Sequence, residues 1–447
     1  MQSLLTWVDF ALLPFYLAAI YFFADRYRNR HYPPGHPWRR YFMPGLFLKI
    51  GGALFIALIY VYYYGFGDSL SFFRSGQVKN SALAESPLKW INLILEIPKY
   101  YDAEYIKYIS QIRLYQTGGN SVIISLGAVV SLLGLNSYLA ASVLFAAFSF
   151  TGIWALFRTF ATLYPESIKY VAYAIIYFPS VIVWGSGLFK DTVCLFALGW
   201  IIHLSFEALV NKRRSFKYIF SLFLCIFLVA IIKIYIIIAL LPAVLFWVLN
   251  NVASRSSSFY YRVFLKSVAP AIVLLLSIGA ANYFSDYLGV YSLDNVIESS
   301  ETLRNNILVD SGEEGSGYEL GEIESTPLGL LMAFPKAVNV TLFRPYLWEA
   351  RKVIILFSAL EAFALLLLTL YVVLKTGFFK VAAIVRTDSN VQFCLIFTLI
   401  FAFAVGISTY NFGTLSRYKI PCLPFYGIAL SIIYYQGNRQ KQLFKQL

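Results

Sequence analysis

Long apolar runs separated by short polar segments are the dominant pattern along this chain. A run of 18 or more apolar residues is long enough to cross the ~30 Å hydrocarbon layer of a bilayer as a helix. The pattern therefore predicts an all-α polytopic membrane protein with about eleven crossings. The predicted crossings lie at residues 4–24, 44–65, 137–158, 169–187, 191–210, 216–232, 234–250, 264–283, 353–374, 391–410 and 417–435.

Basic residues concentrate in four short loops and in the C-terminal tail, and cytoplasmic loops of membrane proteins carry such an excess. An even number of predicted crossings separates each basic segment from the next, so all of them can lie on one side. We therefore expect the N-terminus to lie outside and the tail at 436–447 to be cytoplasmic. The residues that mark the basic segments are Arg26, Arg28, Arg30, Arg39 and Arg40; Lys212, Arg213 and Arg214; Arg255, Arg262 and Lys266; Lys375, Lys380 and Arg386; and Arg439, Lys441 and Lys445.

The predicted organisation is a single membrane domain over 1–447 with two long outer segments. The first, at 66–120, mixes apolar and charged residues at helical spacing and predicts interfacial helices broken near Pro98. The second, at 284–351, is rich in acidic residues and glycine. The apolar segment 121–135 is too short for an ordinary crossing. A crossing there would also place the Arg158 end of the next predicted crossing on the wrong side of the membrane. We interpret it as a re-entrant segment or a short helix at the outer boundary.

Composition supports the membrane interpretation. Apolar residues make up 59% of the chain and charged residues only 13%, which is too little polar surface for a soluble body of 447 residues. The formal net charge of +13 would suggest nucleic acid in a soluble protein, but here the basic cytoplasmic loops account for it. We expect no nucleic-acid partner. His31, His36 and His203 share no ligand spacing, so a histidine-built metal site is not supported. We expect no cofactor, with a divalent cation as the alternative that the sequence does not support.

Asp68 is the strongest candidate for a catalytic residue. It follows the second predicted crossing in the sequence Gly-Phe-Gly-Asp, where Gly65 and Gly67 permit close approach of a ligand to the backbone. A carboxylate at a membrane–water boundary is partly desolvated, which raises its basicity toward that of a general base. The alternative is a solvated acid at the end of a helix.

Several cations are predicted to lie at the same outer face, against the general trend of positive charge inside. Each has a structural alternative, such as a helix cap, a snorkelling lysine or an interfacial anchor paired with nearby acids. Placed together with Asp68, they suit an anionic headgroup on a lipid tail, because cations hold phosphate and the carboxylate can accept a proton. The candidate phosphate-binding residues are Lys190, Lys233, Arg344 and Arg417.

The Gly67–Asp68 pair, the predicted interfacial helices and the element Trp-Gly-Ser-Gly-Leu-Phe-Lys-Asp at 184–191 resemble bacterial C-type (GT-C) membrane glycosyltransferases. This superfamily is related to protein mannosyltransferases and lipid A aminoarabinose transferases. The resemblance is best in the first half of the chain. It implies a bacterial cytoplasmic (inner) membrane and a polyprenyl-phosphate sugar as donor. It further implies that the acceptor is an envelope glycan, lipid or protein, which attacks the sugar with inversion at the extracytoplasmic face.

In the family an acid in the first outer loop deprotonates the acceptor, and Asp68 matches its position. The sequence departs from the family pattern in two ways: Ser69 follows the acid, and a large C-terminal soluble domain is lacking. The candidates for a second acid are Asp102, Glu104 and Asp191.

Two other functions fit the same pattern. An O-antigen-type polymerase or ligase would also place acids and arginines at the outer face. A transporter or a scaffold subunit of an envelope protein complex would need no catalytic acid. A transporter should carry charged or broken helices near the membrane midplane. The mid-helix positions are almost all apolar, with His203 and Glu361 as the main polar exceptions, and this argues against a transporter.

Overall fold

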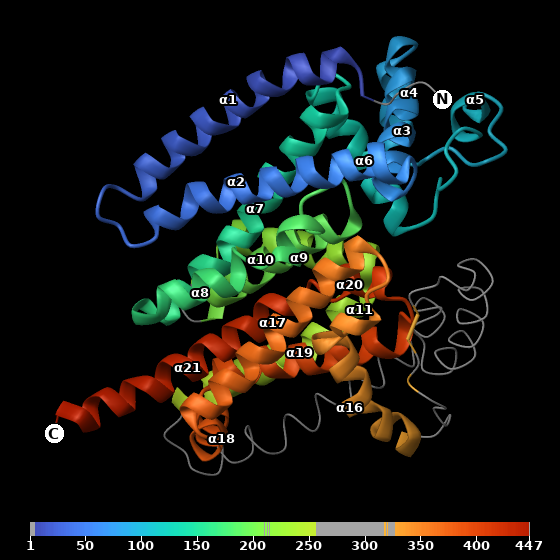
Figure 1. The fold of residues 1–447 in the computed structure, drawn as a ribbon. Helices are drawn as coiled ribbons and strands as arrows, with labels where there is room; N and C mark the ends of the chain where they lie inside the picture. Colours follow the sequence, from blue (N-terminus) through green and yellow to red (C-terminus); the bar gives the residue numbers. More distant parts are fainter. Residues whose placement is uncertain are drawn as a thin grey trace. The chain divides into compact units, whose positions relative to one another are not determined.

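The computed structural model of the chain is built from helices, which Figure 1 labels in chain order. It describes residues 5–209, 211, 213, 215–255, 317, 318, 320 and 327–446. The contacts among these residues divide the chain into two compact units. Unit 1 comprises Met1–Thr159 and Val181–Lys233, and unit 2 comprises Phe160–Ser180 and Ile234–Leu447. The single membrane domain expected from the sequence stays a prediction.

Seven helices in the described part of the chain are long and apolar enough to cross a membrane. Large apolar side chains also lie on the surface, such as Phe15 and Phe23 on the first helix, which are 74% and 68% exposed. Lipid tails accommodate such a surface, whereas water does not. The chain is therefore a multi-pass α-helical membrane protein. The seven helices are α1 (Trp7–His31), α2 (Arg39–Leu58) with its π-helical continuation η1 (Ile59–Tyr64), α7 (Tyr138–Leu163), α10 (Lys190–Leu209), α11 (Phe216–Arg255), α17 (Val353–Thr376) and α19 (Ser389–Ser408).

Two predicted crossings are not continuous helices. Residues 417–435 are interrupted at 419–422, between α20 (Phe412–Tyr418) and α21 (Leu423–Gln446). Residues 169–187 form α8 (Ile168–Ile175) and α9 (Pro179–Val183), which are separated by a break at residues 176–178. Pro179 explains the break, since proline lacks an N–H donor and disfavours helical geometry in the residue before it. The predicted crossing at 264–283 lies outside the described residues. The total number of crossings therefore stays a prediction.

Helix α11 contains the two predicted crossings at 216–232 and 234–250, with Lys233 between them. Lys233 has non-helical backbone angles, φ −151° and ψ 79°. The residue before it belongs to unit 1, where the backbone of Ile232 packs against Gly119. The residues after it belong to unit 2, where Tyr235 stacks on Phe401 with ring centroids 5.9 Å apart. The chain thus passes from one unit to the other at this break.

Unit 1 is held together by buried polar contacts as well as by apolar packing. Asp9 of α1 accepts hydrogen bonds from Ser137 Oγ at 2.7 Å and from the backbone N–H of Tyr138 at 2.8 Å, and so caps the start of α7. Helices α7 and α10 approach each other closely, because a Cβ on Gly199 would lie 2.0 Å from the carbonyl oxygen of Gly152. The remaining helical elements of unit 1 are α3 (Asp68–Ser81), η2 (Ala82–Ala84), α4 (Pro87–Ile94), α5 (Ile106–Ile109) and α6 (Gly119–Leu133).

Helix α6 covers the apolar segment that was too short for an ordinary crossing, and it is 15 residues long. It packs along α3. Asn80 on α3 donates a hydrogen bond to the carbonyl of Ala128 at 2.9 Å, and a Cβ on Gly76 would lie 2.9 Å from the backbone nitrogen of Ala128. This segment is therefore a short helix in the body of unit 1.

Unit 2 is a bundle in which helices cross at small residues. Thr341 Oγ1 donates to the carbonyl of Ala402 at 2.7 Å, which joins α16 to α19. A Cβ on Gly427 would lie 3.0 Å from the Cβ of Ala174, which joins α21 to α8. Besides the helices already given, unit 2 contains η3 (Pro165–Ser167), α16 (Pro327–Phe343), η7 (Leu347–Glu349) and α18 (Phe378–Thr387).

Candidate functional site

One face of α2 carries the packing that builds the candidate site in unit 1. Gly52 lies directly against residue Ile182, because a Cβ at Gly52 would be 2.2 Å from the Ile182 carbonyl oxygen. One turn earlier, the buried Nζ of Lys49 donates hydrogen bonds to the carbonyls of Val181, at 3.3 Å, and Gly185. These carbonyls belong to the last turn of α9 and the segment after it. Lys49 therefore fixes the start of the 184–191 element on α2.

The turn after this helix presents Asp68. Helix α2 ends in the π-helical turn η1, a geometry often found at functional sites. Gly65 follows with φ +68° and Gly67 with φ +128°. A Cβ at Gly67 would lie 2.4 Å from the Tyr60 ring, so only glycine fits there. Asp68 is then the first residue of α3, half-buried, where the helix dipole favours a negative charge. It begins a helix and does not end one.

Tyr60 connects this turn to the 184–191 element. Its ring touches Gly67 on one side. It also packs against Phe189, with ring centroids 5.4 Å apart, and Phe189 directly precedes Lys190. Both Tyr60 and Phe189 are buried. Asp68 and Lys190 are far apart in sequence, but Asp68 directly follows Gly67 and Lys190 directly follows Phe189, and both of these preceding residues lie against Tyr60.

Lys233 and Asp191 form a buried ion pair at the start of α10. Their side chains are 5% and 1% exposed. A buried pair of this kind is costly to break, because each partner would leave an uncompensated charge. The pair ties the break in α11 to the first turn of α10. Both residues were predicted site residues, and the structure brings them together with Lys190 next in sequence.

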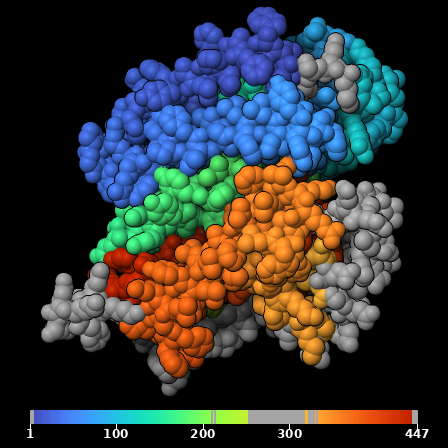
Figure 2. Space-filling view, viewed as in Figure 1, coloured from blue at the N-terminus to red at the C-terminus, as the bar shows by residue number. Residues whose placement is uncertain are grey.

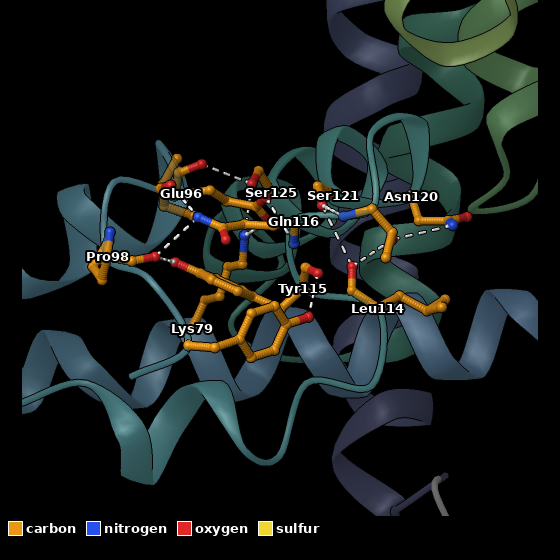
Figure 3. A network of polar contacts seen from close by, with 12 residues as sticks. Lys79, Glu96, Pro98, Leu114, Tyr115, Gln116, Asn120, Ser121 and Ser125 are labelled. Carbon is orange, nitrogen blue, oxygen red and sulfur yellow. Dashed lines mark hydrogen bonds and ion pairs between the residues drawn. The ribbon is translucent and has the colours of Figure 1, made fainter. Parts of the chain in front are cut away.

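The first predicted outer segment has a charged network at its centre, drawn in Figure 3. Lys79 of α3 is fully buried and donates to Glu96 at 2.8 Å and to Ser125 Oγ at 2.9 Å. Glu96 also accepts a hydrogen bond from the backbone N–H of Gln116 at 3.2 Å. The Lys79 ammonium lies 5.6 Å from the ring centroid of Tyr115. Burial lowers the pKa of Lys79, and the carboxylate of Glu96 opposes that shift. The network joins α3, α6 and the loop between α4 and α6.

The candidate second acids of this segment have local partners. Asp102 accepts a hydrogen bond from the backbone N–H of Glu104 at 3.2 Å, and so closes a turn. Glu104 is 59% exposed at its side chain and pairs with Lys89 at 3.1 Å. Nearby, hydrogen bonds from Lys107 lower the pKa of Glu85 to about 2. These contacts are those of a folded, solvated loop surface.

The other two predicted phosphate ligands lie in unit 2. Arg344 follows α16 and forms a forked ion pair with Glu349, whose oxygens lie 3.1 and 3.0 Å from Arg344 Nε. Aromatic rings surround this guanidinium: the centroids of Tyr318, Tyr346 and Phe412 lie 5.6, 5.6 and 5.4 Å from its central carbon. Such a box stabilises a cation by its ring quadrupoles.

Arg417 is half-buried on α20, the short helix that begins with Phe412. Two residues on, the buried Lys419 donates to the carbonyl of Arg344 at 3.3 Å. The segment 411–420 is thereby attached to the Arg344 turn. Arg344 and Arg417 therefore belong to one neighbourhood of unit 2, while Asp68, Lys190 and Lys233 belong to unit 1.

Sequence reasoning missed Lys49 and the Lys79–Glu96 pair. Lys49 was detectable as a lone lysine inside the second predicted crossing, since an ionisable residue within a membrane helix needs a named partner. Its partners were not detectable, because they are backbone carbonyls and leave no mark in the sequence. Lys79 and Glu96 had no distinguishing signal among the other charges of their segment.

Within the described ranges, no group of three or more histidine, cysteine, aspartate or glutamate side chains could hold a metal ion. No protein-family model, curated protein or solved structure matches this chain.

Proposed function

We propose that this protein is a glycosyltransferase that takes a sugar from a polyprenyl-phosphate donor at the extracytoplasmic face of the membrane, with Asp68 as general base. One observation carries the proposal: Tyr60 packs between the Gly67–Asp68 turn and the Phe189–Lys190 turn. The residues that directly precede the Asp68 carboxylate and the Lys190 cation thus both lie against one buried ring. A transferase that uses an anionic lipid donor needs this combination.

The reaction assigns a separate task to each charge. The acceptor hydroxyl attacks the anomeric carbon of the sugar, and its proton passes to the Asp68 carboxylate. The bond between the anomeric carbon and the phosphate oxygen breaks, and the polyprenyl phosphate leaves with the electron pair. Lys190 stabilises the negative charge that develops on the leaving phosphate. Attack opposite the leaving group inverts the configuration, and Asp68 returns its proton to water.

We assign the general base to Asp68 because it begins α3 directly after Gly67, the residue that lies against Tyr60. The other candidate carboxylates have defined contacts in the fold. Asp102 closes a turn, Glu104 pairs with Lys89, and Asp191 pairs with Lys233. Among the cations, we assign the phosphate to Lys190 because it directly follows Phe189, which packs against Tyr60. Arg417 belongs to unit 2, and its role as a phosphate ligand stays a prediction from the sequence.

The test uses the purified full-length protein and a panel of radiolabelled polyprenyl-phosphate sugars, with release of polyprenyl phosphate as the readout. Asp68→Asn should lower the release rate by at least ~100-fold, the usual contribution of a general base. Binding of polyprenyl phosphate should stay within about threefold, since the amide keeps the shape of the site. Asp102→Asn is the matched control and should retain the rate. Full activity of Asp68→Asn would exclude Asp68 from the mechanism.

A second candidate function, a transporter, is favoured by ionisable groups and helix breaks inside the candidate spans. Lys49 is buried within α2, and Glu361 of α17 accepts hydrogen bonds from both the backbone N–H and the hydroxyl of Ser180 at 2.6 Å. Helix α11 is broken at Lys233. Charged groups and broken helices of this kind mark substrate paths in transporters. Glu361→Gln separates the two functions, because it should leave donor turnover unchanged in a transferase but impair vesicle uptake in a transporter.

A further inference from the structure

The turn between α1 and α2 contains a hollow of about 740 Å³, well within the size range of small-molecule sites. Its lining includes the charged side chains of Arg28, Arg39 and Arg40, the imidazole of His36, and the apolar side chains of Met43 and Phe47. It therefore combines positive charge with an apolar wall. It belongs to unit 1, at the opposite end of α2 from Asp68.

The charge around this hollow is poorly balanced by acids. Arg28 pairs with Asp25. Arg39 donates only to neutral oxygens, the Tyr32 carbonyl and Asn29 Oδ1, both at 2.7 Å. Arg40 is exposed and stacks over the Tyr41 ring at 4.8 Å. Among the described residues, no carboxylate pairs with Arg39 or Arg40, so an anion would gain two uncompensated guanidinium groups.

The turn between α1 and α2 is held by contacts with α7 and within the turn itself. Tyr32 is buried, its hydroxyl accepts a hydrogen bond from Trp154 Nε1 of α7 at 2.8 Å, and its ring packs against Trp154 and Phe42. The backbone N–H of Trp38 donates to His36 Nδ1 at 3.2 Å. A ligand would therefore meet a preformed site and would not have to order the loop.

The apolar wall continues out of the hollow along the helices. Phe47 is 50% exposed and stacks on Tyr21 of α1, with ring centroids 6.3 Å apart and planes 7° from parallel. Arg40, Met43 and Phe47 are spaced three and four residues apart, so they share one face of α2. Figure 2 shows the surface that α1 and α2 form together, in blue. An acyl chain lying on this surface would have its headgroup among the arginines.

We propose that this hollow binds the phosphate headgroup of an anionic phospholipid, with an acyl chain along the Tyr21–Phe47 surface. Basic pockets between membrane helices bind anionic headgroups in this way. The apolar wall favours a lipid over a soluble phosphate, because a free anion would leave that wall unused. The site is independent of the proposed transfer reaction and does not involve Asp68 or Lys190.

The experiment measures lipid retention by the full-length protein in native mass spectrometry, with dioleoyl phosphatidylglycerol and dioleoyl phosphatidylcholine as probes. Phosphatidylglycerol should bind at least ~tenfold more tightly than phosphatidylcholine. The double variant Arg39→Gln/Arg40→Gln should lose most of this preference. The single variant Arg40→Gln removes no hydrogen bond that holds the turn. It should lose about half of the difference in binding free energy between phosphatidylglycerol and phosphatidylcholine.

The matched control is Arg26→Gln/Arg30→Gln, which removes the same charge from exposed positions on the same end of α1. It should retain the preference for phosphatidylglycerol. An equal loss in both double variants would overturn the proposal, because only general charge attraction would then be acting. Full displacement of the lipid by millimolar inorganic phosphate would also overturn it, because the site would then take a soluble anion.

Discussion

The two ends of the helix formed by α2 and η1 carry different kinds of chemistry. From its middle to its C-terminal end, Gly52 and Tyr60 pack against the 182–189 segment, and Lys49, one turn before Gly52, is buried with its ammonium on backbone carbonyls. At its N-terminal end, Arg39 and Arg40 line an open hollow and have no carboxylate partner among the described residues. In the first region the cation is hydrogen-bonded inside the fold, whereas in the second the cations line an open hollow.

This difference indicates how to separate structural charges from binding charges in a membrane protein. A buried cation with fixed internal partners positions the backbone around it. A cation on a rigid, open surface with few acids nearby can exchange water for a ligand at little structural cost. Substitutions at the first kind of residue should therefore change folding, and substitutions at the second kind should change binding.

The largest effect is expected at Gly52. In Gly52→Ala the new Cβ would lie 2.2 Å from the Ile182 carbonyl oxygen, so α2 would have to move off the 182–189 segment. Overpacking of this kind costs about 1–3 kcal/mol or more. The apparent melting temperature in detergent, followed by fluorescence-detected size exclusion, should fall by several degrees. Gly51→Ala is the control, because a Cβ at Gly51 meets nothing within 4 Å. Equal melting temperatures for the two variants would contradict the close approach.

Lys49→Met should have the next largest effect. It removes the donor from the carbonyls of Val181 and Gly185 and leaves Gly185 with a weaker bond from Ser149 at 3.2 Å. Loss of a buried partner costs about 1–3 kcal/mol, so thermal stability should fall and the 184–191 element should loosen. Accelerated hydrogen exchange at residues 184–189 is the specific readout. Lys99→Met, at an exposed position, removes the same charge and should change neither quantity.

Gly67→Ala should impair the Asp68 turn without unfolding the protein. Its φ of +128° and the 2.4 Å approach of a Cβ to the Tyr60 ring both oppose any side chain. We expect a cost of about 1–3 kcal/mol, confined to the turn, and a loss of donor turnover. Gly65→Ala has φ +68° and open space around it, so it should cost only about 1–2 kcal/mol for the left-handed backbone. If both variants turned over donor at the wild-type rate, the Tyr60 contact would not position Asp68.

Arg40→Gln should have the smallest effect on stability. The side chain is exposed and its stacking on Tyr41 is worth at most about 1 kcal/mol, so the melting temperature should stay within a degree or two of the wild type. Its effect should appear in phospholipid binding instead. A large loss of stability would show that this end of α2 is structural as well, and the contrast between the two ends would fail.

The sequence was sufficient for the membrane class and for the spans that have a strong apolar signal. It also indicated the turn that carries Asp68, because Gly65 and Gly67 punctuate the end of an apolar run. It did not predict the break within residues 169–187, where Pro179 divides an apolar run into two helices although the hydropathy is uninterrupted. It could not predict that Asp191 pairs with Lys233, because the two residues lie in different helices and their spacing in the sequence does not indicate an ion pair.

The sequence by itself determined that the protein resides in a membrane, because long apolar helices with few charges are stable in lipid and not in water. What only the tertiary structure decided is which charges are already satisfied. Lys49 and Arg40 are both single cations on α2 in the sequence. Their roles differ because one is enclosed by carbonyls that come from residues more than a hundred positions away, and the other remains at an open surface. Such long-range contacts arise from packing, and local composition does not encode them.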